Sequence, residues 1–120
     1  MSSAHPYSPA YHVDGFGFVS GALSVDRDGV AVSGDLEALH AAMARLEERL
    51  NTIDMTLSDV VKTSYFVTDI ALRDLANEHY AEVFTEPRPA RSFVAVADLP
   101  YGASVEIEAI AYRRPPTNHR

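Results

Sequence analysis

The regular spacing of apolar residues after Asp35 constrains the fold of this chain more than any other feature. Successive apolar positions lie three or four residues apart, which is the spacing of one face of an α-helix. These positions are Leu36, Leu39, Met43, Leu46, Leu50 and Ile53. A coiled-coil seam has similar spacing, but this run ends before three heptads are complete. We therefore expect a helix from Asp35 to about Ile53, capped by Ser33 or Gly34, that packs against a β-sheet.

The segments before and after this helix have the composition of strands and tight turns. Asp14-Gly15 predicts a hairpin that leads into a strand at 16–20, and Asp28-Gly29 predicts a second turn before a short strand at 30–32. Residues rich in β-branched and aromatic side chains predict further strands at 60–67, 92–97 and 104–112.

A second helix is expected after Asp69, which can cap it. Its apolar face would carry Leu72, Leu75, Ala76, His79, Tyr80 and Val83. The order of elements predicts a single α+β domain over residues 1–120, with two α-helices packed on one face of a mixed β-sheet. Residues 1–6 and 114–120 are expected to be flexible.

In such a domain the second face of the sheet has no helix to cover it. The last predicted strand directs Glu106, Glu108, Ile110 and Tyr112 to that face, because alternate residues of a strand point the same way. This face therefore combines carboxylates with apolar side chains. We expect the chain to oligomerise through it.

Composition disfavours several classes of partner. Seventeen acidic residues stand against ten Lys plus Arg, for a net charge of −7, and such a charge repels phosphate backbones and anionic lipids. The absence of cysteine excludes disulfides and thiolate catalysis. There is neither a signal-like N-terminus nor a run of apolar residues long enough to span a membrane. We expect a cytoplasmic protein that binds neither nucleic acid nor membranes.

The five histidines are dispersed, and none has a second histidine four residues away as in a helical metal pair. They are His5, His12, His40, His79 and His119. The glycines form no phosphate-binding fingerprint, and Ser20 is not in the nucleophile elbow of a hydrolase. We therefore expect no metal and no cofactor.

Three charged residues are candidates for chemistry. Arg91 follows Pro89, whose ring restrains the backbone, and a restrained guanidinium suits a carboxylate ligand. From spacing alone, a surface arginine or a structural ion pair is the favoured interpretation. Glu106 and Glu108 share one face of a strand and suit a bound water or a proton transfer. The alternative is a pair of charges that prevents edge-to-edge aggregation.

Several segments, in their order and spacing, resemble the Rid (reactive intermediate deaminase, YjgF) family. They are residues 18–21, 59–63, 77–84, 99–100 and 105–111, together with Pro89-Ala90-Arg91-Ser92. The resemblance extends from Tyr7 to Arg113. It implies a chorismate-mutase-like fold and a homotrimer with sites in the clefts between subunits.

The resemblance also implies an activity that needs no cofactor. Deaminating members hydrolyse reactive imines and enamines, such as 2-aminoacrylate, to 2-keto acids and ammonia. By position, Arg91 would hold the substrate carboxylate and Glu108 would orient or activate water, while Tyr7, Ser20 and Phe93 would line the pocket. An imine is already electrophilic, so placing one water against its carbon is the main requirement.

Some positions depart from the family pattern. Ala22 stands where glutamine is usual, Phe93 where cysteine is frequent and Asp54 where glycine is common. The connection before Pro89 is short and carries Arg88, a candidate for a second anion contact. These departures predict a divergent subgroup. The alternatives to deamination are a biosynthetic enzyme for a larger imine or carbonyl substrate and a non-catalytic trimer that binds small carboxylates; the acidic surface disfavours a ribonuclease.

Overall fold

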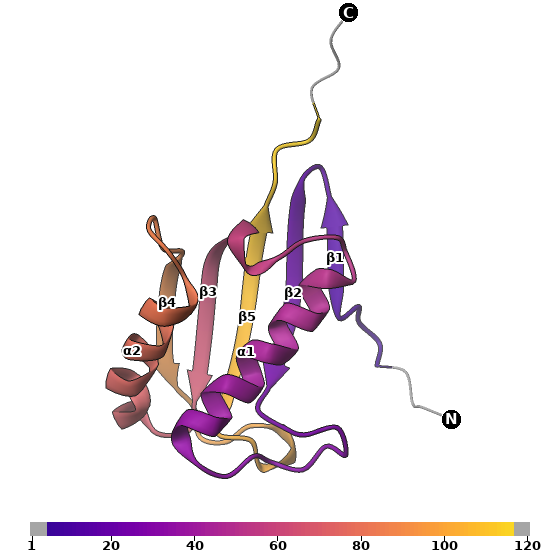
Figure 1. The fold of residues 1–120 in the computed structure, drawn as a ribbon. Helices are drawn as coiled ribbons and strands as arrows, with labels where there is room; N and C mark the ends of the chain where they lie inside the picture. Colours follow the sequence, from indigo (N-terminus) through magenta and orange to yellow (C-terminus); the bar gives the residue numbers. More distant parts are fainter. Residues whose placement is uncertain (1–4, 117–120) are drawn as a thin grey trace, which may run out of the picture.

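Both helices lie on the same side of a single sheet. In the computed structural model, which describes residues 5–116, two helices cross one face of a five-stranded mixed sheet (Figure 1). The strands are β1 Ala10–Val13, β2 Phe16–Leu23, β3 Val60–Val67, β4 Ala90–Ala95 and β5 Val105–Tyr112. The helices are α1 Asp35–Asn51 and α2 Arg73–Val83. The predicted α+β architecture is confirmed.

The strands lie in the order β1-β2-β5-β3-β4. β3 and β4 are parallel, because α2 carries the chain back across the sheet between them, and the other neighbouring pairs are antiparallel. β4 begins at Ala90, two residues before the predicted strand, since its pairing with β3 starts there opposite Lys62. β4 and β1 are the two edge strands.

α1 packs on the sheet through most of the predicted face. Its buried residues are Ala38, Leu39, Ala42, Met43, Leu46 and Leu50. Leu36 was predicted on this face but is 40% exposed in the first turn, and two alanines complete the buried stripe instead. α1 ends at Asn51 rather than near Ile53, because Asp54 adopts a positive φ of 58° and the Met55 N–H turns back to the Leu50 carbonyl.

The N-terminal hairpin is confirmed, with positive φ values of 53° at Asp14 and 86° at Gly15. A turn also forms at Gly29, where φ is 78°. The short strand predicted at 30–32 is wrong, since only a single bridge joins Val25 to Ala31. The Asp26 carboxylate accepts the N–H of Val30 at 2.9 Å, so a group that a strand would use for pairing is engaged within the turn.

α2 buries Ala76, His79 and Tyr80 against the sheet. The Tyr80 hydroxyl lies 2.8 Å from the hydroxyl of Thr63 on β3, and this buried hydrogen bond joins the helix to the sheet. Asp69 does not cap α2 directly. It accepts the Ala71 N–H at 3.0 Å in a short 3-10 turn that precedes the helix.

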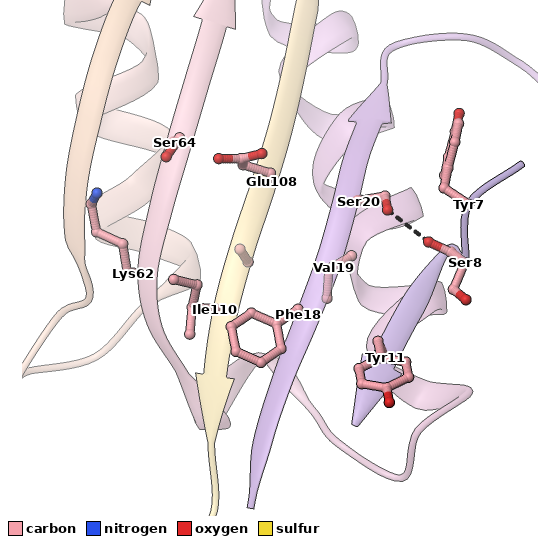
Figure 2. A pocket seen from close by; sticks show the side chains of 11 residues that line it. Tyr7, Ser8, Tyr11, Phe18, Val19, Ser20, Lys62, Ser64, Glu108 and Ile110 are labelled. Carbon is pink, nitrogen blue, oxygen red and sulfur yellow. Dashed lines mark hydrogen bonds between the residues drawn. The ribbon is translucent and has the colours of Figure 1, made fainter. Parts of the chain in front are cut away.

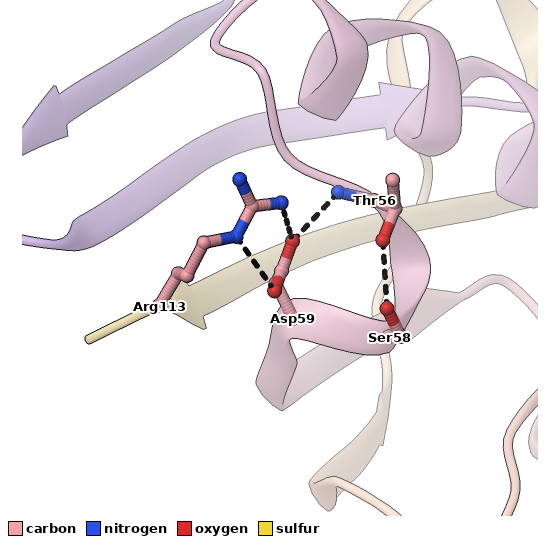
Figure 3. A network of polar contacts seen from close by, with 4 residues as sticks. All are labelled: Thr56, Ser58, Asp59 and Arg113. Atoms are coloured by element: carbon pink, nitrogen blue, oxygen red, sulfur yellow. Dashed lines mark hydrogen bonds and ion pairs between the residues drawn. The ribbon is translucent and has the colours of Figure 1, made fainter. Parts of the chain in front are cut away.

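An ion pair joins the end of β5 to the turn before β3 (Figure 3). Arg113 donates through Nη2 to Asp59 at 2.6 Å, and Asp59 also accepts the Thr56 N–H at 2.9 Å. The hydrogen bond from Arg113 holds the pKa of Asp59 below its usual value. The ionised carboxylate thus fixes the entry to β3.

The face of the sheet opposite the helices carries several exposed apolar side chains. They include Tyr11, Val13, Phe16, Phe18 and Ile110. The rings of Phe16 and Tyr112 pack with their centroids 4.8 Å apart. Within residues 5–116, neither helix combines the length and apolar character that crossing a membrane requires. Oligomerisation through this face stays a prediction.

His79 generates a prediction about acid stability. Its ring packs 4.7 Å from that of His40, its side chain is buried, and its Nδ1 has no hydrogen-bond partner within residues 5–116. Burial lowers the pKa of His79, and His40 lowers it further. The unfolded chain, with a histidine pKa of about 6.5, therefore binds a proton more readily than the folded chain.

The stability that neutral His79 contributes is present above pH ~6.5 and is lost as pH falls towards its lower folded pKa. We expect His79→Leu to reduce the loss of thermal stability between about pH 7.5 and pH 5.5, because it removes this proton uptake. Thermal melts at the two pH values measure this loss of stability, with His12→Leu as the control at an exposed position. Equal acid sensitivity in the two variants would contradict the assignment.

Candidate functional site

The face without helices holds a cavity of about 600 Å³ between β2, β5 and β3 (Figure 2). Three predicted site residues, Tyr7, Ser20 and Glu108, line it. The Ser20 hydroxyl donates to the Ser8 carbonyl at 2.7 Å, and the Ser20 N–H donates to the Pro9 carbonyl at 3.0 Å. Ser20 therefore fixes the N-terminal segment that presents Tyr7 to this face.

A second cavity, of about 420 Å³, shares Tyr7 with the first and contains Glu106. Glu106 is partly buried, whereas Glu108 is exposed. Burial raises the pKa of Glu106, the neighbouring Glu108 raises it further, and the Arg49 guanidinium lowers it. A carboxyl group whose pKa is raised above its usual value holds a proton more readily and is suited to proton transfer in catalysis.

Gly21 allows Glu106 to occupy this position. A Cβ atom at residue 21 would lie 2.6 Å from Cδ and 2.9 Å from Cγ of Glu106. Both distances are too short for non-bonded carbon atoms. The Glu106 side chain therefore packs over a surface that only glycine provides.

Arg91 lies on the other face of the sheet, beneath α2. Its guanidinium carbon is 4.9 Å from the ring centroids of both Tyr80 and Phe93 and 5.2 Å from that of Tyr65. Nη2 donates to Oδ1 of Asn77, while Nη1 has no hydrogen-bond partner within the described residues. Neither ion pair found in that part of the chain involves Arg91. Of the two interpretations that spacing favoured, a surface arginine or a structural ion pair, the ion pair is wrong for the described residues, and the cation is held by aromatic rings and an amide.

Phe93 belongs to this aromatic support. Its ring stacks on that of Tyr65, with centroids 5.4 Å apart and an angle of 25° between the planes. Phe93 thus lies with Arg91 under α2 and does not line the cavity that holds Ser20 and Glu108.

The structure does not bring Arg91 and Glu108 together within one chain. Arg91 pairs with Thr63, whose side chain is buried beneath α2, whereas Glu108 pairs with the next residue, Ser64. Neighbouring residues of a strand point to opposite faces. The predicted site residues therefore form two groups: Arg91 and Phe93 on the helix side, and Tyr7, Ser20 and Glu108 on the open side.

Three comparisons bear on what these groups do. A family model described as Endoribonuclease L-PSP matches residues 1–113. The human 2-iminobutanoate/2-iminopropanoate deaminase is 37% identical over 114 residues, which cover 93% of this chain and 83% of the human protein. The crystal structure of RidA from an Antarctic Psychrobacter bacterium is 31% identical with a TM-score of 0.84, covering 93% of this chain and 92% of that one. The chain belongs to the Rid family.

A structure from Thermotoga maritima also has the Rid-family fold, with a TM-score of 0.86 and 40% identity over 92% of this chain and 89% of that one. These relatives match both layers of the domain, so they support the chorismate-mutase-like fold that the resemblance implied. Family membership does not by itself assign the reaction or its residues.

Two residues near the candidate site of this Rid-family chain were not predicted from the sequence. Asn77 holds the Arg91 guanidinium from α2, and its place on an exposed helix surface carries no chemical signal. Arg49 of α1 lines the same cavity as Glu106, although a charged residue on an amphipathic helix is usually only a solvated one.

The other polar candidates are engaged elsewhere. Arg88 donates to the Phe84 carbonyl at 2.9 Å and to Glu86 at 2.9 Å, so its expected contact with a second anion gains no support. Within residues 5–116, no group of three or more potential metal ligands comes together. His119 lies outside the described residues.

The contact between Gly21 and Glu106 yields a prediction. We expect Gly21→Ala to push the Glu106 side chain towards solvent and so lower the raised pKa of its carboxyl group, because burial is the main cause of that rise. A ¹³C NMR titration of the glutamate carboxyl groups measures the change. An unchanged Glu106 titration in Gly21→Ala would show that the contact does not set its position.

Proposed function

We propose that the chain hydrolyses reactive imines and enamines of 2-imino acids to 2-keto acids and ammonia. The observation that carries the proposal is the state of Arg91, a partly buried guanidinium with no acidic partner among the described residues. Aromatic faces hold a cation without consuming its N–H donors. Nη2 already donates to Asn77, whereas Nη1 has no partner among the described residues. We therefore propose Nη1 and the second N–H of Nη2 as the donors for the two oxygens of a substrate carboxylate.

The second requirement is a group that handles the proton of the attacking water. The resemblance assigned this task to Glu108. We favour Glu106, because its carboxyl group is partly buried against Gly21, in a cavity that Arg49 also lines, and because burial raises its pKa. Both carboxylates remain candidates, and they are separable by substitution.

The proposed reaction needs little besides positioning. Arg91 binds the carboxylate, water adds to the imine carbon as its proton passes to the glutamate, and the glutamate returns a proton to the nitrogen. The glutamate then takes the hydroxyl proton of the resulting carbinolamine and passes it to the amino nitrogen as the carbon–nitrogen bond breaks, which releases ammonia and leaves the 2-keto acid. No oxidant or reductant is consumed.

Assembly is part of the proposal. Arg91 and Glu106 point to opposite faces of one sheet, so a single chain cannot present both to one small substrate. A second copy that brings its open face against the β4 edge would place the two groups in one cleft. The exposed apolar residues Phe16, Phe18 and Ile110 suit such an interface. We propose a homotrimer with sites between subunits, located in the cytoplasm.

The activity is measured by generating 2-iminopropanoate with an amino-acid oxidase and following its loss in the presence of semicarbazide. We expect the wild type to accelerate imine loss. Arg91→Met should lower kcat/KM by roughly 100-fold, because it removes the carboxylate contact that positions the substrate. Arg73→Met is the matched control, an exposed arginine at the start of α2.

Glu106→Gln and Glu108→Gln decide the proton-handling residue in the same assay. We expect the larger loss of kcat in Glu106→Gln. A wild type that binds 2-keto acids without turnover would select the non-catalytic binding trimer instead. Equal rates of imine loss with the wild type and with Arg91→Met would contradict the proposed function.

A further inference from the structure

Two residues of β2 are left out of its pairing with β5, and an arginine of α1 donates hydrogen bonds to their carbonyl groups. β2 pairs with β5 as far as Val19 and again from Ala22, so Ser20 and Gly21 form a bulge. Nη1 of Arg49 donates to the carbonyl oxygen of Ser20 at 3.0 Å and to that of Gly21 at 2.9 Å. A bulge leaves backbone groups without ladder partners, and Arg49 supplies a donor for both.

These two hydrogen bonds determine how the bulge is oriented. In a trans peptide the N–H points opposite to the preceding carbonyl. By holding the carbonyls of Ser20 and Gly21, Arg49 therefore also sets the directions of the N–H groups of Gly21 and Ala22. The same bulge locates the N-terminal segment, because the Ser20 hydroxyl bonds to the Ser8 carbonyl.

Arg49 and Glu106 line one cavity, and both lie against Gly21. The charge of Arg49 acts on Glu106 against burial and against the neighbouring Glu108. The other charged or titratable groups in that cavity come from four elements of the chain. They are His5 and Tyr7, Asp26 and Arg27, Arg45, and Tyr101.

We propose that Arg49 is a positioning residue of the site, which holds the bulge at Ser20 and Gly21 in place and keeps a positive charge beside Glu106. Its effect on turnover rests on the proposed imine hydrolysis. Its effects on the bulge and on the ionisation of Glu106 are independent of that reaction.

Arg45 provides the matched control. It lies one helical turn earlier on α1 and donates to the carbonyls of Val25 and Asp26 at 3.2 and 3.3 Å. Arg45 and Arg49 thus make the same kind of contact, an arginine bound to two consecutive carbonyls, but only Arg49 contacts the bulge. A purely structural role would make the two substitutions equivalent.

The test compares Arg49→Met, Arg49→Lys and Arg45→Met in the full chain, after circular dichroism has verified that each folds. A ¹³C NMR titration follows the Glu106 carboxyl, and the imine assay gives kcat, KM and the pH profile of kcat. We expect Arg49→Met to raise the pKa of Glu106, since it removes a cation, and to move the acid limb of the profile in the same direction. Its kcat should fall about tenfold with a smaller change in KM.

The two other variants separate charge from geometry. Arg49→Lys keeps the charge and should leave the pKa of Glu106 near its wild-type value, while recovering only part of kcat because one ammonium replaces the planar guanidinium. Arg45→Met should move neither the pKa nor the acid limb. The proposal is overturned if Arg49→Met leaves the titration of Glu106 unchanged or if Arg45→Met shifts it equally. If the wild type does not turn over imines, the proposed function fails and the titration alone decides the role of Arg49.

Discussion

The sheet is covered by helices on one face only, and this constraint determines where every candidate residue lies. Alternate residues of β3 and β5 are divided between a dry layer under the helices and an open face. Tyr65 and Ile107 belong to the dry layer, and Glu106 and Glu108 belong to the open face. Arg91, on the neighbouring strand β4, shares the helix side with Tyr65. Arg91, the proposed carboxylate-binding cation, and Glu106, the proposed proton-handling acid, are therefore separated by the thickness of the sheet within one chain.

Local patterns predicted most of the fold because they reflect local physics. The spacing of Leu39, Met43, Leu46 and Leu50 repeats with the helix, and Asp14-Gly15 matches the positive φ values of a hairpin turn. The failures came from contacts that periodicity does not record. The strand expected at 30–32 is absent because the Asp26 carboxylate bonds to the Val30 N–H.

The site was less predictable because it depends on contacts between distant segments. Arg91 is held by rings from β3, α2 and β4, and no spacing rule connects residues 65, 80 and 93. Because residues two positions apart on a strand point the same way, Glu106 and Glu108 were predicted on one face, as the structure shows. The difference between them arises at the β2 bulge, where Gly21 and Arg49 surround only Glu106.

The central claim is that one site takes Arg91 from one subunit and Glu106 from another, and a subunit-mixing experiment tests it most directly. Arg91→Met and Glu106→Gln chains, each expected to keep only a small part of the wild-type activity alone, are unfolded together in equal amounts and refolded. In a ring assembled at random, about one quarter of the interfaces then combine an intact Arg91 with an intact Glu106. The account predicts recovery of about one quarter of wild-type imine hydrolysis, as the same random pairing requires. Mixed assemblies that stay as inactive as the separate variants would contradict it.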